Sequence, residues 1–382
     1  MTQHYDVAII GSGPSGASSA FYLAQKGIST VIIEKETLPR YKTCGGGFVF
    51  RGRKNLPFDI KEVVEKEFHT VDIYLGDKLH FRTHREEPTI SMIMRDTFDN
   101  LITQKAKEFG ATLLENHKLK GLSFSDNIIT LETSQGNYTT NFVIAADGAL
   151  SPTAKMAGWK EDTRKLIPAL EYEVEVSDED FERLSKEVRF DIDAIPYGYA
   201  WNFPKKKHLS IGVASARRTK INLKEHYQQY LKTLNITNIV SESQHGFQIP
   251  VSPRTDGFVK NNVFLIGDAA GFADPITAEG ISNAIYSGKL AAEAIIEANK
   301  EPQLAKKLYL EKIEETLLPE IKTGLWLSKW FYEQKTIRNI LLKKFGQQFS
   351  EAMADVFHGK RSYPKDIKKT ITNKIKNYYL KN

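Results

Sequence analysis

The chain has 382 residues, of which 41% are hydrophobic and 26% charged, a composition that is typical of globular proteins and excludes disordered and fibrous ones. Because domains usually contain roughly 100 to 200 residues, we expect two or three of them. The single cysteine, Cys44, excludes both an intramolecular disulfide framework and a cysteine-pair redox centre. No apolar run reaches the roughly 18 residues that span a bilayer, and no signal segment precedes the first predicted strand. We therefore expect a soluble or peripheral protein of the cytoplasm.

The net charge of +6 at pH 7 is unevenly distributed along the chain. Residues 359–382 contain eight Lys or Arg and one Asp, a net charge of +7, so the other residues together carry −1. A basic tail of this kind suits peripheral contact with an anionic membrane surface, although many such runs are simply solvated chain ends. No nucleic-acid partner is expected, since no recognition motif accompanies the tail, and no metal, since the nine histidines lack ligand spacing.

The first residues of the chain predict a strand, a turn, a helix and a second strand. Residues 5–10 form a short apolar run, 11–16 are rich in glycine, and 17–26 show a helical pattern that Gly27 ends. A second apolar strand follows at 30–33. This β-α-β order predicts a parallel sheet covered by helices.

The glycine-rich turn reads G-x-G-x-x-G, and Glu34 follows its first glycine by 23 residues. The first glycine permits the tight turn, the second lets the backbone approach a pyrophosphate, and the third lets helix and strand pack closely. The helix N-terminus offers free N–H groups to phosphates, while Glu34 would accept hydrogen bonds from a ribose and repel a ribose 2′-phosphate. The turn thus predicts a tightly bound FAD or NAD. The expected contacts are Gly11, Gly13, Pro14, Ser15, Gly16, Glu34 and Lys35.

A second signal, at residues 263–271, favours FAD over NAD. The predicted strand there ends in Gly267-Asp268, whose carboxylate can hold the ribityl hydroxyls of a flavin nucleotide. A helix that begins at Gly280 could stabilise the anion formed when the flavin is reduced. The chain has no second G-x-G-x-x-G for a nicotinamide domain, so a pyridine nucleotide would visit the flavin only transiently. The expected FAD contacts here are Gly267, Asp268, Pro275, Gly280 and Ile281.

The remaining elements predict an α/β fold (α+β overall) with a Rossmann-like FAD-binding domain, an inserted, mostly antiparallel β-sheet domain for substrate, and a helical C-terminal segment. Residues 165–256 alternate apolar and polar positions, as a half-exposed sheet does. In the C-terminal segment, large apolar residues are spaced near one helical face, namely Trp326, Trp330, Ile337, Leu341 and Phe345. The predicted domains are residues 1–70, 90–160 and 257–300 (FAD-binding), 71–89 and 161–256 (substrate-binding sheet), and 301–382 (helical segment with basic tail).

These nucleotide motifs resemble those of the FAD-dependent oxidoreductases with a p-hydroxybenzoate hydroxylase-like fold, over about the first 300 residues. Ala146-Asp147-Gly148, after a predicted strand, is similar to the Asp-Gly motif of that superfamily. The resemblance implies that Asp147, Gly148 and Arg95 lie by the flavin nucleotide, with Arg40 in a similar place. From the residues alone, both arginines fit a surface position equally well.

The segment 196–212 carries a more specific resemblance. At strand period, four aromatic residues share one face, a pattern that ordinary packing of a sheet on its core also produces. With Pro204 closing the strand and Gly212 eight residues later, the segment resembles the geranylgeranyl reductase family, in which it lines a lipid cavity beside the flavin. The resemblance implies substrate contacts from Tyr197, Tyr199, Trp201, Phe203 and Pro204, of which Tyr199 and Trp201 are also candidate catalytic residues.

Cys44-Gly45-Gly46-Gly47 resembles the same family. The three glycines would let the backbone approach the isoalloxazine and let a long substrate pass. The resemblance implies that Cys44, Gly45 and Gly46 contact the flavin, that Gly47 contacts substrate, and that Cys44 has a catalytic or substrate-orienting role. A lone cysteine fits a small buried apolar residue at least as well.

The resemblance, which covers nearly the whole chain, implies an FAD-dependent reductase that saturates C=C bonds of a geranylgeranyl or other polyprenyl lipid, quinone or diphosphate. Hydride would pass from N5 of the reduced flavin to one carbon and an acid would protonate the other, with Cys44, a tyrosine or water as candidate acids. NAD(P)H or a reduced redox protein would supply electrons. A flavin-dependent monooxygenase or halogenase on the same fold is the first alternative, which the Cys-Gly-Gly-Gly motif disfavours. A non-enzymatic prenyl-lipid carrier is the second, which intact Glu34 and Asp268 disfavour.

Overall fold

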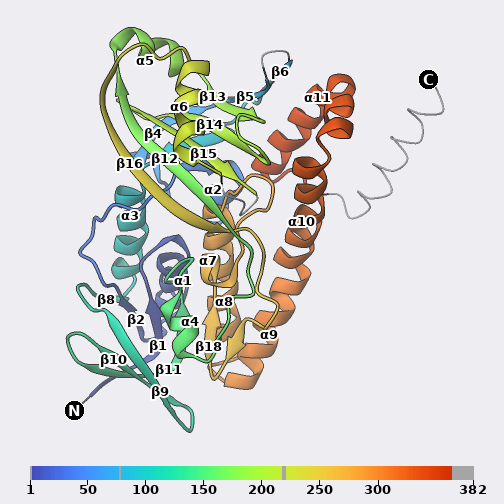
Figure 1. Ribbon diagram of the computed structural model, residues 1–382. Coiled ribbons are helices and arrows are strands. Elements are labelled where there is room, and N and C mark those ends of the chain that lie inside the picture. The colour runs from blue at the N-terminus through green and yellow to red at the C-terminus, as the bar shows by residue number, and fades with distance from the viewer. Residues whose placement is uncertain (1, 77–78, 217–220, 364–382) are drawn as a thin grey trace, which may run out of the picture.

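A computed structural model describes residues 2–76, 79–216 and 221–363. Its largest sheet has eight strands in the order β17-β18-β11-β1-β2-β8, with β10 beside β11 and β9 beside β10 (Figure 1). The central strands are parallel, and β9, β10 and β17 pair antiparallel. The strands are β1 (Gln3–Ile10), β2 (Thr30–Ile33), β8 (Thr112–Leu114), β9 (Leu119–Ser125), β10 (Ile128–Thr133), β11 (Asn137–Ala145), β17 (Val259–Lys260) and β18 (Val263–Leu265).

Helices pack on this first sheet, in which strands β2 and β18 are apolar and fully buried. Helix α1 contacts both α3 and α8, and α8 contacts α9. A Cβ on Gly16 would lie 2.0 Å from Gly11 O, so the third glycine of the motif lets α1 lie against β1, as the sequence predicts. The helices around this sheet are α1 (Pro14–Ala24), α3 (Arg95–Glu108), α4 (Pro152–Met156), α7 (Gly267–Ala270), α8 (Ile281–Glu297) and α9 (Pro302–Glu315).

A second sheet of seven strands has the order β16-β12-β15-β14-β13-β5-β6 and lies at the other end of the molecule (Figure 1). Its pairs are antiparallel except β5 with β13. One face packs against α6 (Leu223–Thr233), and α5 (Asp178–Leu184) lies at the end of β12. The strands are β5 (Thr70–Leu75), β6 (Leu79–His84), β12 (Leu166–Val176), β13 (Val188–Ile192), β14 (Gly198–Pro204), β15 (Leu209–Ser215) and β16 (Ile239–Pro250).

A third, three-stranded sheet joins the two larger ones. It has the order β3-β7-β4, and all of its pairs are antiparallel. Its elements are β3 (Gly47–Val49), α2 (Phe50–Arg53), the 3-10 helix Lys61–Val63, β4 (Val64–Phe68) and β7 (Ile90–Ile93). The strand β3 continues directly from the Cys44–Gly47 segment, so this small sheet fixes where that segment lies.

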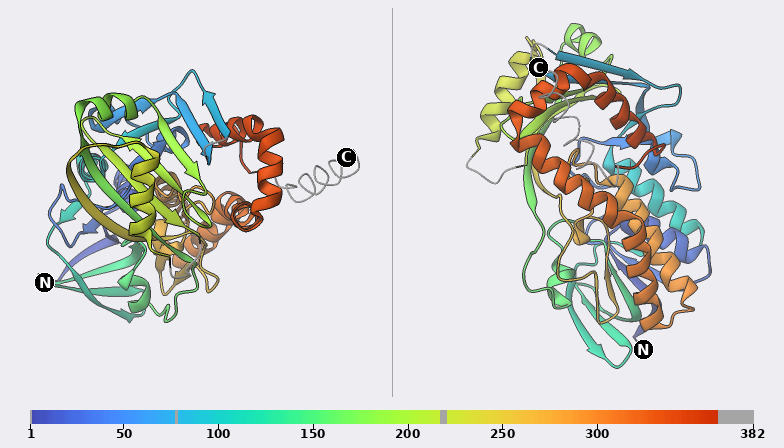
Figure 2. Two further views of the ribbon diagram at one scale, coloured as in Figure 1. Left: turned by 45° about the horizontal axis from the view of Figure 1, so that its top comes forward. Right: turned by 90° about the vertical axis from the view of Figure 1, so that its right-hand side faces the viewer.

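The C-terminal helices α9, α10 (Leu317–Glu333) and α11 (Lys335–His358) run along one side of the molecule from the first sheet to the second (Figure 2). The predicted single apolar face is wrong, because the chain leaves helical geometry at Gln334 and again at Phe345. The predicted residues Trp326, Trp330, Ile337, Leu341 and Phe345 are only half-buried. The buried side chains of these helices include Phe331, Tyr332, Arg338 and Leu342.

The predicted fold class is confirmed: a mixed α/β chain with a Rossmann-like sheet, a mostly antiparallel second sheet and a helical C-terminal segment. Within the described ranges, no helix is both long and apolar enough to cross a membrane. Most of the basic tail predicted at 359–382 lies outside the described residues.

Candidate functional site

A cavity of about 1100 Å³ extends from the carboxyl ends of β1 and β2 to the inner face of the second sheet. Ligand pockets are typically about 300–1,000 Å³, so this one has room for a dinucleotide and part of a second ligand. The predicted site residues that line it are Gly11, Gly13, Pro14, Ser15, Glu34, Lys35, Arg40, Cys44, Gly45, Gly46, Gly47, Arg95, Asp147, Gly148, Tyr199, Trp201, Phe203, Asp268, Gly280 and Ile281.

Five predicted site residues do not line the cavity, and each has a structural reason. Gly16 packs on Gly11, and a Cβ on Gly267 would lie 2.9 Å from Ser15 Oγ. The ring of Pro275 packs toward Gly324 of α10. Tyr197 has a positive φ of 59° and precedes β14, so it does not join the aromatic face of that strand. Pro204 is the last residue of β14 and is buried beyond the cavity.

The nucleotide end of the cavity is built around the carboxylate of Glu34, which is 3% exposed. Its Oε2 accepts hydrogen bonds from Ser12 N at 2.9 Å and Ser12 Oγ at 2.5 Å, so it also fixes the glycine-rich turn. Gly11 has a φ of +100°, which favours glycine, and a Cβ there would lie 2.7 Å from Ala146 O. Among the described residues, no side chain caps the N-terminus of α1. These groups fit the ribose and pyrophosphate of a dinucleotide.

Both arginines that the sequence left undecided line the cavity, because one buried carboxylate holds them. Asp99 accepts hydrogen bonds from Arg95 Nε at 2.8 Å and Arg95 Nη2 at 2.9 Å, and from Arg40 Nη1 at 3.0 Å. Burial raises the pKa of Asp268, and the nearby Lys42 and Arg95 oppose this shift. Burial, followed by repulsion from Arg95, lowers the pKa of Lys42 to about 8. The middle of the cavity is therefore basic and suits a pyrophosphate.

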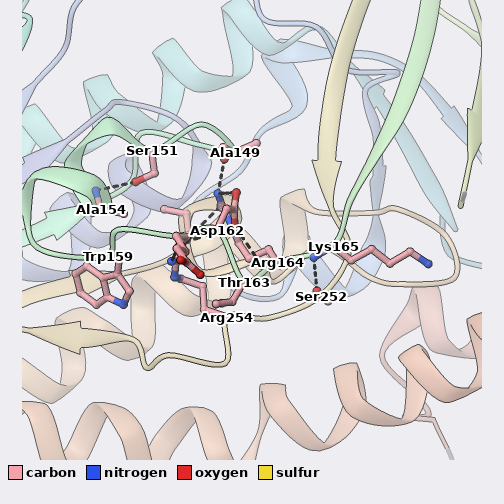
Figure 3. Close-up of polar contacts among 12 residues, drawn as sticks. Ala149, Ser151, Ala154, Trp159, Asp162, Thr163, Arg164, Lys165, Ser252 and Arg254 are labelled. Carbon is pink, nitrogen blue, oxygen red and sulfur yellow. Dashed lines mark hydrogen bonds and ion pairs between the residues drawn. The ribbon is translucent and has the colours of Figure 1, made fainter. Parts of the chain in front are cut away.

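Two loops that line the cavity are tied together by Arg164, which the sequence did not indicate. Its guanidinium is held by Asp162 and donates a hydrogen bond to Ala149 O (Figure 3). It also donates a hydrogen bond to Asp268 O. The side chain of Arg164 is only 2% exposed. The carboxylate of Asp147 is used within its own loop, where it accepts from Ser151 Oγ at 2.6 Å. Arg164 therefore positions the Asp-Gly and Gly-Asp turns relative to each other.

The Cys44–Gly47 segment crosses the cavity directly beneath the aromatic strand. An added Cβ on Gly45 would lie 3.0 Å from Trp201 Nε1, and one on Gly46 would lie 2.1 Å from Ile93 O. The buried ammonium of Lys205 donates to Gly45 O at 2.6 Å and to Ile93 O at 3.1 Å, although burial lowers its pKa. No side chain larger than hydrogen fits at Gly46, which explains why the segment is so rich in glycine.

The inner face of the second sheet forms the other wall. The ring centroids of Tyr199 and Trp201 lie 5.9 Å apart, and those of Trp201 and Phe203 lie 6.1 Å apart. Tyr199 Oη donates to Thr277 O at 2.5 Å, and burial raises the pKa of this phenol. In the described part of the chain, the buried indole Nε1 of Trp201 has no hydrogen-bond partner. Gly212 leaves room for that indole, since a Cβ there would lie 2.2 Å from Trp201 Cζ2.

The N-terminus of α8, which the sequence predicts beside the flavin, lies at the cavity with one of its N–H groups bound by a side chain. Glu279 Oε1 accepts from Ser282 N at 2.8 Å, so this N–H group is already used. Gly280 and Ile281 still line the cavity. FAD fits this cavity along its whole length. Its ribose would bind the buried carboxylate of Glu34, its pyrophosphate the basic side chains in the middle, and a polar atom of its flavin ring the unpaired indole N–H group of Trp201 at the far end.

Cavity residues that the sequence reasoning missed include a buried carboxyl, Glu171, beside the Cys44–Gly47 segment. Glu171 lies on β12 and accepts a hydrogen bond from Cys44 N at 3.0 Å. The strand reads Leu-Glu-Tyr-Glu-Val-Glu-Val, which indicates a solvent-facing row of carboxylates. The alternating pattern therefore predicted a solvent-exposed carboxylate at position 171, whereas the structure places Glu171 at the cavity.

Comparison with known proteins agrees with this site. A family model described as "FAD binding domain" matches residues 4–51 and 59–305. A chloroplastic geranylgeranyl diphosphate reductase of Arabidopsis thaliana is 30% identical over 404 aligned positions, which cover 96% of this chain and 83% of the relative.

Two solved structures are similar in fold. One is a geranylgeranyl bacteriochlorophyll reductase-like protein from Thermoplasma acidophilum, with a TM-score of 0.74, 24% identity, and 94% of this chain and 92% of that one covered. The other is a probable FAD-dependent monooxygenase from Pseudomonas aeruginosa, with a TM-score of 0.69, 16% identity, and 87% and 98% covered. The resemblance inferred from the sequence is confirmed: the chain belongs to the FAD binding domain family and, within it, to the geranylgeranyl reductase family of FAD-dependent oxidoreductases.

Proposed function

We propose that this oxidoreductase saturates isolated C=C bonds of a geranylgeranyl or other polyprenyl group. The observation that carries the proposal is the wall formed by Tyr199, Trp201 and Phe203 directly over the glycine-rich Cys44–Gly47 segment, at the end of the cavity away from Glu34. A polyprenyl chain gains about 0.8 kcal/mol for each buried CH₂ group, so an apolar wall binds it without many polar contacts.

When bound, FAD would supply a hydride in its reduced state. The chain's own residues would hold the cofactor by its ribose at Glu34, by its pyrophosphate near Arg40, Lys42 and Arg95, and by its ribityl chain at Asp268. The aromatic wall would exclude water and align the substrate. An unactivated alkene offers hydride no carbonyl to polarise, so alignment and water exclusion must lower the barrier.

Three further features belong to this proposal. NAD(P)H or a small redox protein would reduce the bound cofactor, since the chain has only one dinucleotide turn. The prenyl group would be carried by a lipid, a quinone or a diphosphate. The FAD-binding domain would comprise residues 1–70, 90–160 and 257–300, with the substrate sheet domain at 71–89 and 161–256.

The test is a single turnover without oxygen. The purified holoprotein is reduced anaerobically and mixed with geranylgeranyl diphosphate, or with a geranylgeranyl glycerol ether, while its visible spectrum is followed. We expect reoxidation by the lipid and a product that is heavier by two hydrogens for each bond reduced. A cofactor that stays reduced with every prenyl lipid and reoxidises only when oxygen enters would favour the monooxygenase or halogenase alternative. Protein that binds prenyl lipid but no flavin would favour the carrier.

We also propose that the basic tail brings the protein to an anionic membrane surface, where a prenyl lipid would be found. Deleting residues 364–382 should reduce sedimentation with vesicles that contain anionic lipid, and high salt should have the same effect on the full chain. Unchanged sedimentation would discard the membrane contact and leave the reductase proposal intact.

A further inference from the structure

We propose that Glu171 is the catalytic acid, which supplies the proton to the second carbon of the reduced double bond. This inference rests on the proposed function and assigns the group that the family resemblance leaves open.

The two carboxyl oxygens of Glu171 have different surroundings. Oε1 accepts hydrogen bonds from Cys44 N at 3.0 Å and Tyr41 Oη at 3.3 Å. Within the described residues, Oε2 has no hydrogen-bond partner, while the side chain lines the cavity and the residue is 3% exposed. Because Oε1 is occupied by two donors, the proton of the neutral acid belongs on Oε2, the oxygen that is free to face a ligand.

The pairing of the strands puts this carboxyl at the edge of the aromatic wall. Glu171 is opposite Gly212 on β15, and Gly212 is opposite Trp201 on β14, so the three residues share one face of the sheet. Since Gly212 has no side chain, the indole of Trp201 lies over it. A chain held against the indole therefore passes close to both Glu171 and the Cys44–Gly47 segment.

Two other candidate acids, Tyr199 and Cys44, already take part in hydrogen bonds. Tyr199 Oη donates its only proton to Thr277 O. Cys44 Sγ accepts a hydrogen bond from Gly46 N at 3.4 Å. Within the described residues, Oε2 of Glu171 takes part in no hydrogen bond, and the side chain lines the cavity.

The surroundings of Glu171 bring its pKa close to neutral pH, so that part of the protein carries the neutral acid there. Burial, followed by repulsion from Glu173 on the same strand, raises its pKa to about 7, while Lys205 and the hydrogen bonds from Cys44 N and Tyr41 oppose the shift. Glu173 itself pairs with His208 at 2.8 Å. On the other side, His245 of β16 is the strand neighbour of Glu171, and its ring packs at a tilt against the Tyr41 ring with centroids 4.3 Å apart. A general acid works best with a pKa near the operating pH.

The step balances in atoms and electrons. The π bond breaks, one carbon gains a hydride and the other gains the proton of Glu171 Oε2, so two new C–H bonds form and Glu171 becomes a carboxylate. The cofactor loses two electrons, which NAD(P)H or a reduced redox protein must restore. Tyr41 is 43% exposed and donates to Oε1, so it links the carboxylate to bulk water for reprotonation.

The first experiment measures single-turnover reoxidation by geranylgeranyl diphosphate in the wild type, Glu171→Gln, Glu171→Asp and Glu175→Gln. Glu175 is an exposed carboxylate on the same strand and serves as the control. Removing a general acid typically costs about 10²- to 10⁴-fold, so we expect Glu171→Gln to be slower by at least about 100-fold, with FAD content and lipid affinity retained. Glu171→Asp should recover part of the rate, and Glu175→Gln should match the wild type.

The pH profile and the infrared spectrum supply the second readout. The wild-type rate should fall above about pH 7, where Glu171 loses its proton, and the small residual rate of Glu171→Gln should lose this limb. In the apoprotein, a carboxyl C=O stretching band that titrates near neutral pH should be absent from Glu171→Gln and present in Glu175→Gln. This readout needs neither cofactor nor turnover.

The outcomes separate the two proposals. If the wild type reduces prenyl lipid and Glu171→Gln does so at the same rate with the same pH limb, only the acid assignment is overturned. The absence of a titrating carboxyl band near neutral pH in the apoprotein also overturns it. If the wild type reduces no prenyl lipid at all, the proposed function fails, and this assignment fails with it.

Discussion

The buried carboxyl of Glu171 should give the apoprotein a pH-dependent stability that Glu171→Gln removes. Its pKa is raised from 4.5 to about 7, first by burial and then by Glu173. Each pKa unit corresponds to about 1.4 kcal/mol, so the shift corresponds to about 3 kcal/mol. Between pH about 4.5 and about 7, the folded chain keeps this proton while the unfolded chain has lost it, so the free energy of unfolding falls as pH rises.

The assay is urea unfolding of the apoprotein at several pH values, followed by tryptophan fluorescence. The stability of the wild type minus that of Glu171→Gln should fall by about 3 kcal/mol from pH 4.5 to pH 8 and should be constant outside that window. Glu175→Gln is the matched control, because Glu175 is exposed on the same strand. Parallel pH curves for the wild type and Glu171→Gln would refute the reasoning, because they would mean that the carboxyl titrates alike in the folded and unfolded chain.

Three more predictions concern the cofactor and the wall. Arg164→Leu should weaken FAD binding by at least about tenfold in a fluorescence titration, because buried carbonyls lose a donor worth about 1–3 kcal/mol each; unchanged affinity would contradict its positioning role. Glu34→Ala should weaken FAD binding by about 10- to 100-fold, because the ribose would lose a buried hydrogen-bond acceptor. Full affinity would mean that the ribose binds elsewhere. Gly212→Ala should displace the Trp201 ring and abolish prenyl-lipid binding while FAD binding is retained. Gly246→Ala, whose Cβ would lie 3.7 Å from its nearest neighbour, should change neither lipid binding nor FAD binding. Equal lipid binding by the two variants would refute the role of the aromatic wall in binding the lipid.

The first sheet and its nucleotide turn could be predicted because their signals are local. A strand, a glycine turn, a helix and an acid within 34 residues leave few arrangements in space, and the Gly-Asp turn after β18 needs only its own strand. The C-terminal helices could not be predicted in the same way. Which of their side chains are buried depends on the break in the helix at Gln334 and on the side where the second sheet lies. The spacing of apolar residues in the sequence predicts neither.

The cavity shows the same division. Glycines and aromatic residues are informative because few environments require them, so the Cys44–Gly47 segment and the strand with Trp201 were found. Glu171 was not, because a carboxylate every second residue has the same pattern whether it faces water or a basic, enclosed cavity. The pairing of β12 with β15 places Glu171 beside the aromatic wall, and the hydrogen bond from Cys44 N places it beside the Cys44–Gly47 segment. Both contacts join residues that are far apart in the sequence.

The C-terminal segment contributes to the cofactor side of the cavity as well as covering the fold. Tyr332 of α10 donates to Ile276 O at 2.6 Å, and Tyr363 donates to Asp274 Oδ2 at 2.9 Å. The other oxygen of Asp274 accepts from Thr277 N at 2.8 Å, so these hydroxyls hold the loop that leads to Gly280. A truncation that removes Tyr363 would therefore leave a buried carboxylate oxygen without its donor and loosen that loop. For this reason a deletion that begins at residue 364 separates a membrane role of the tail from damage to the cofactor site, whereas a longer one does not.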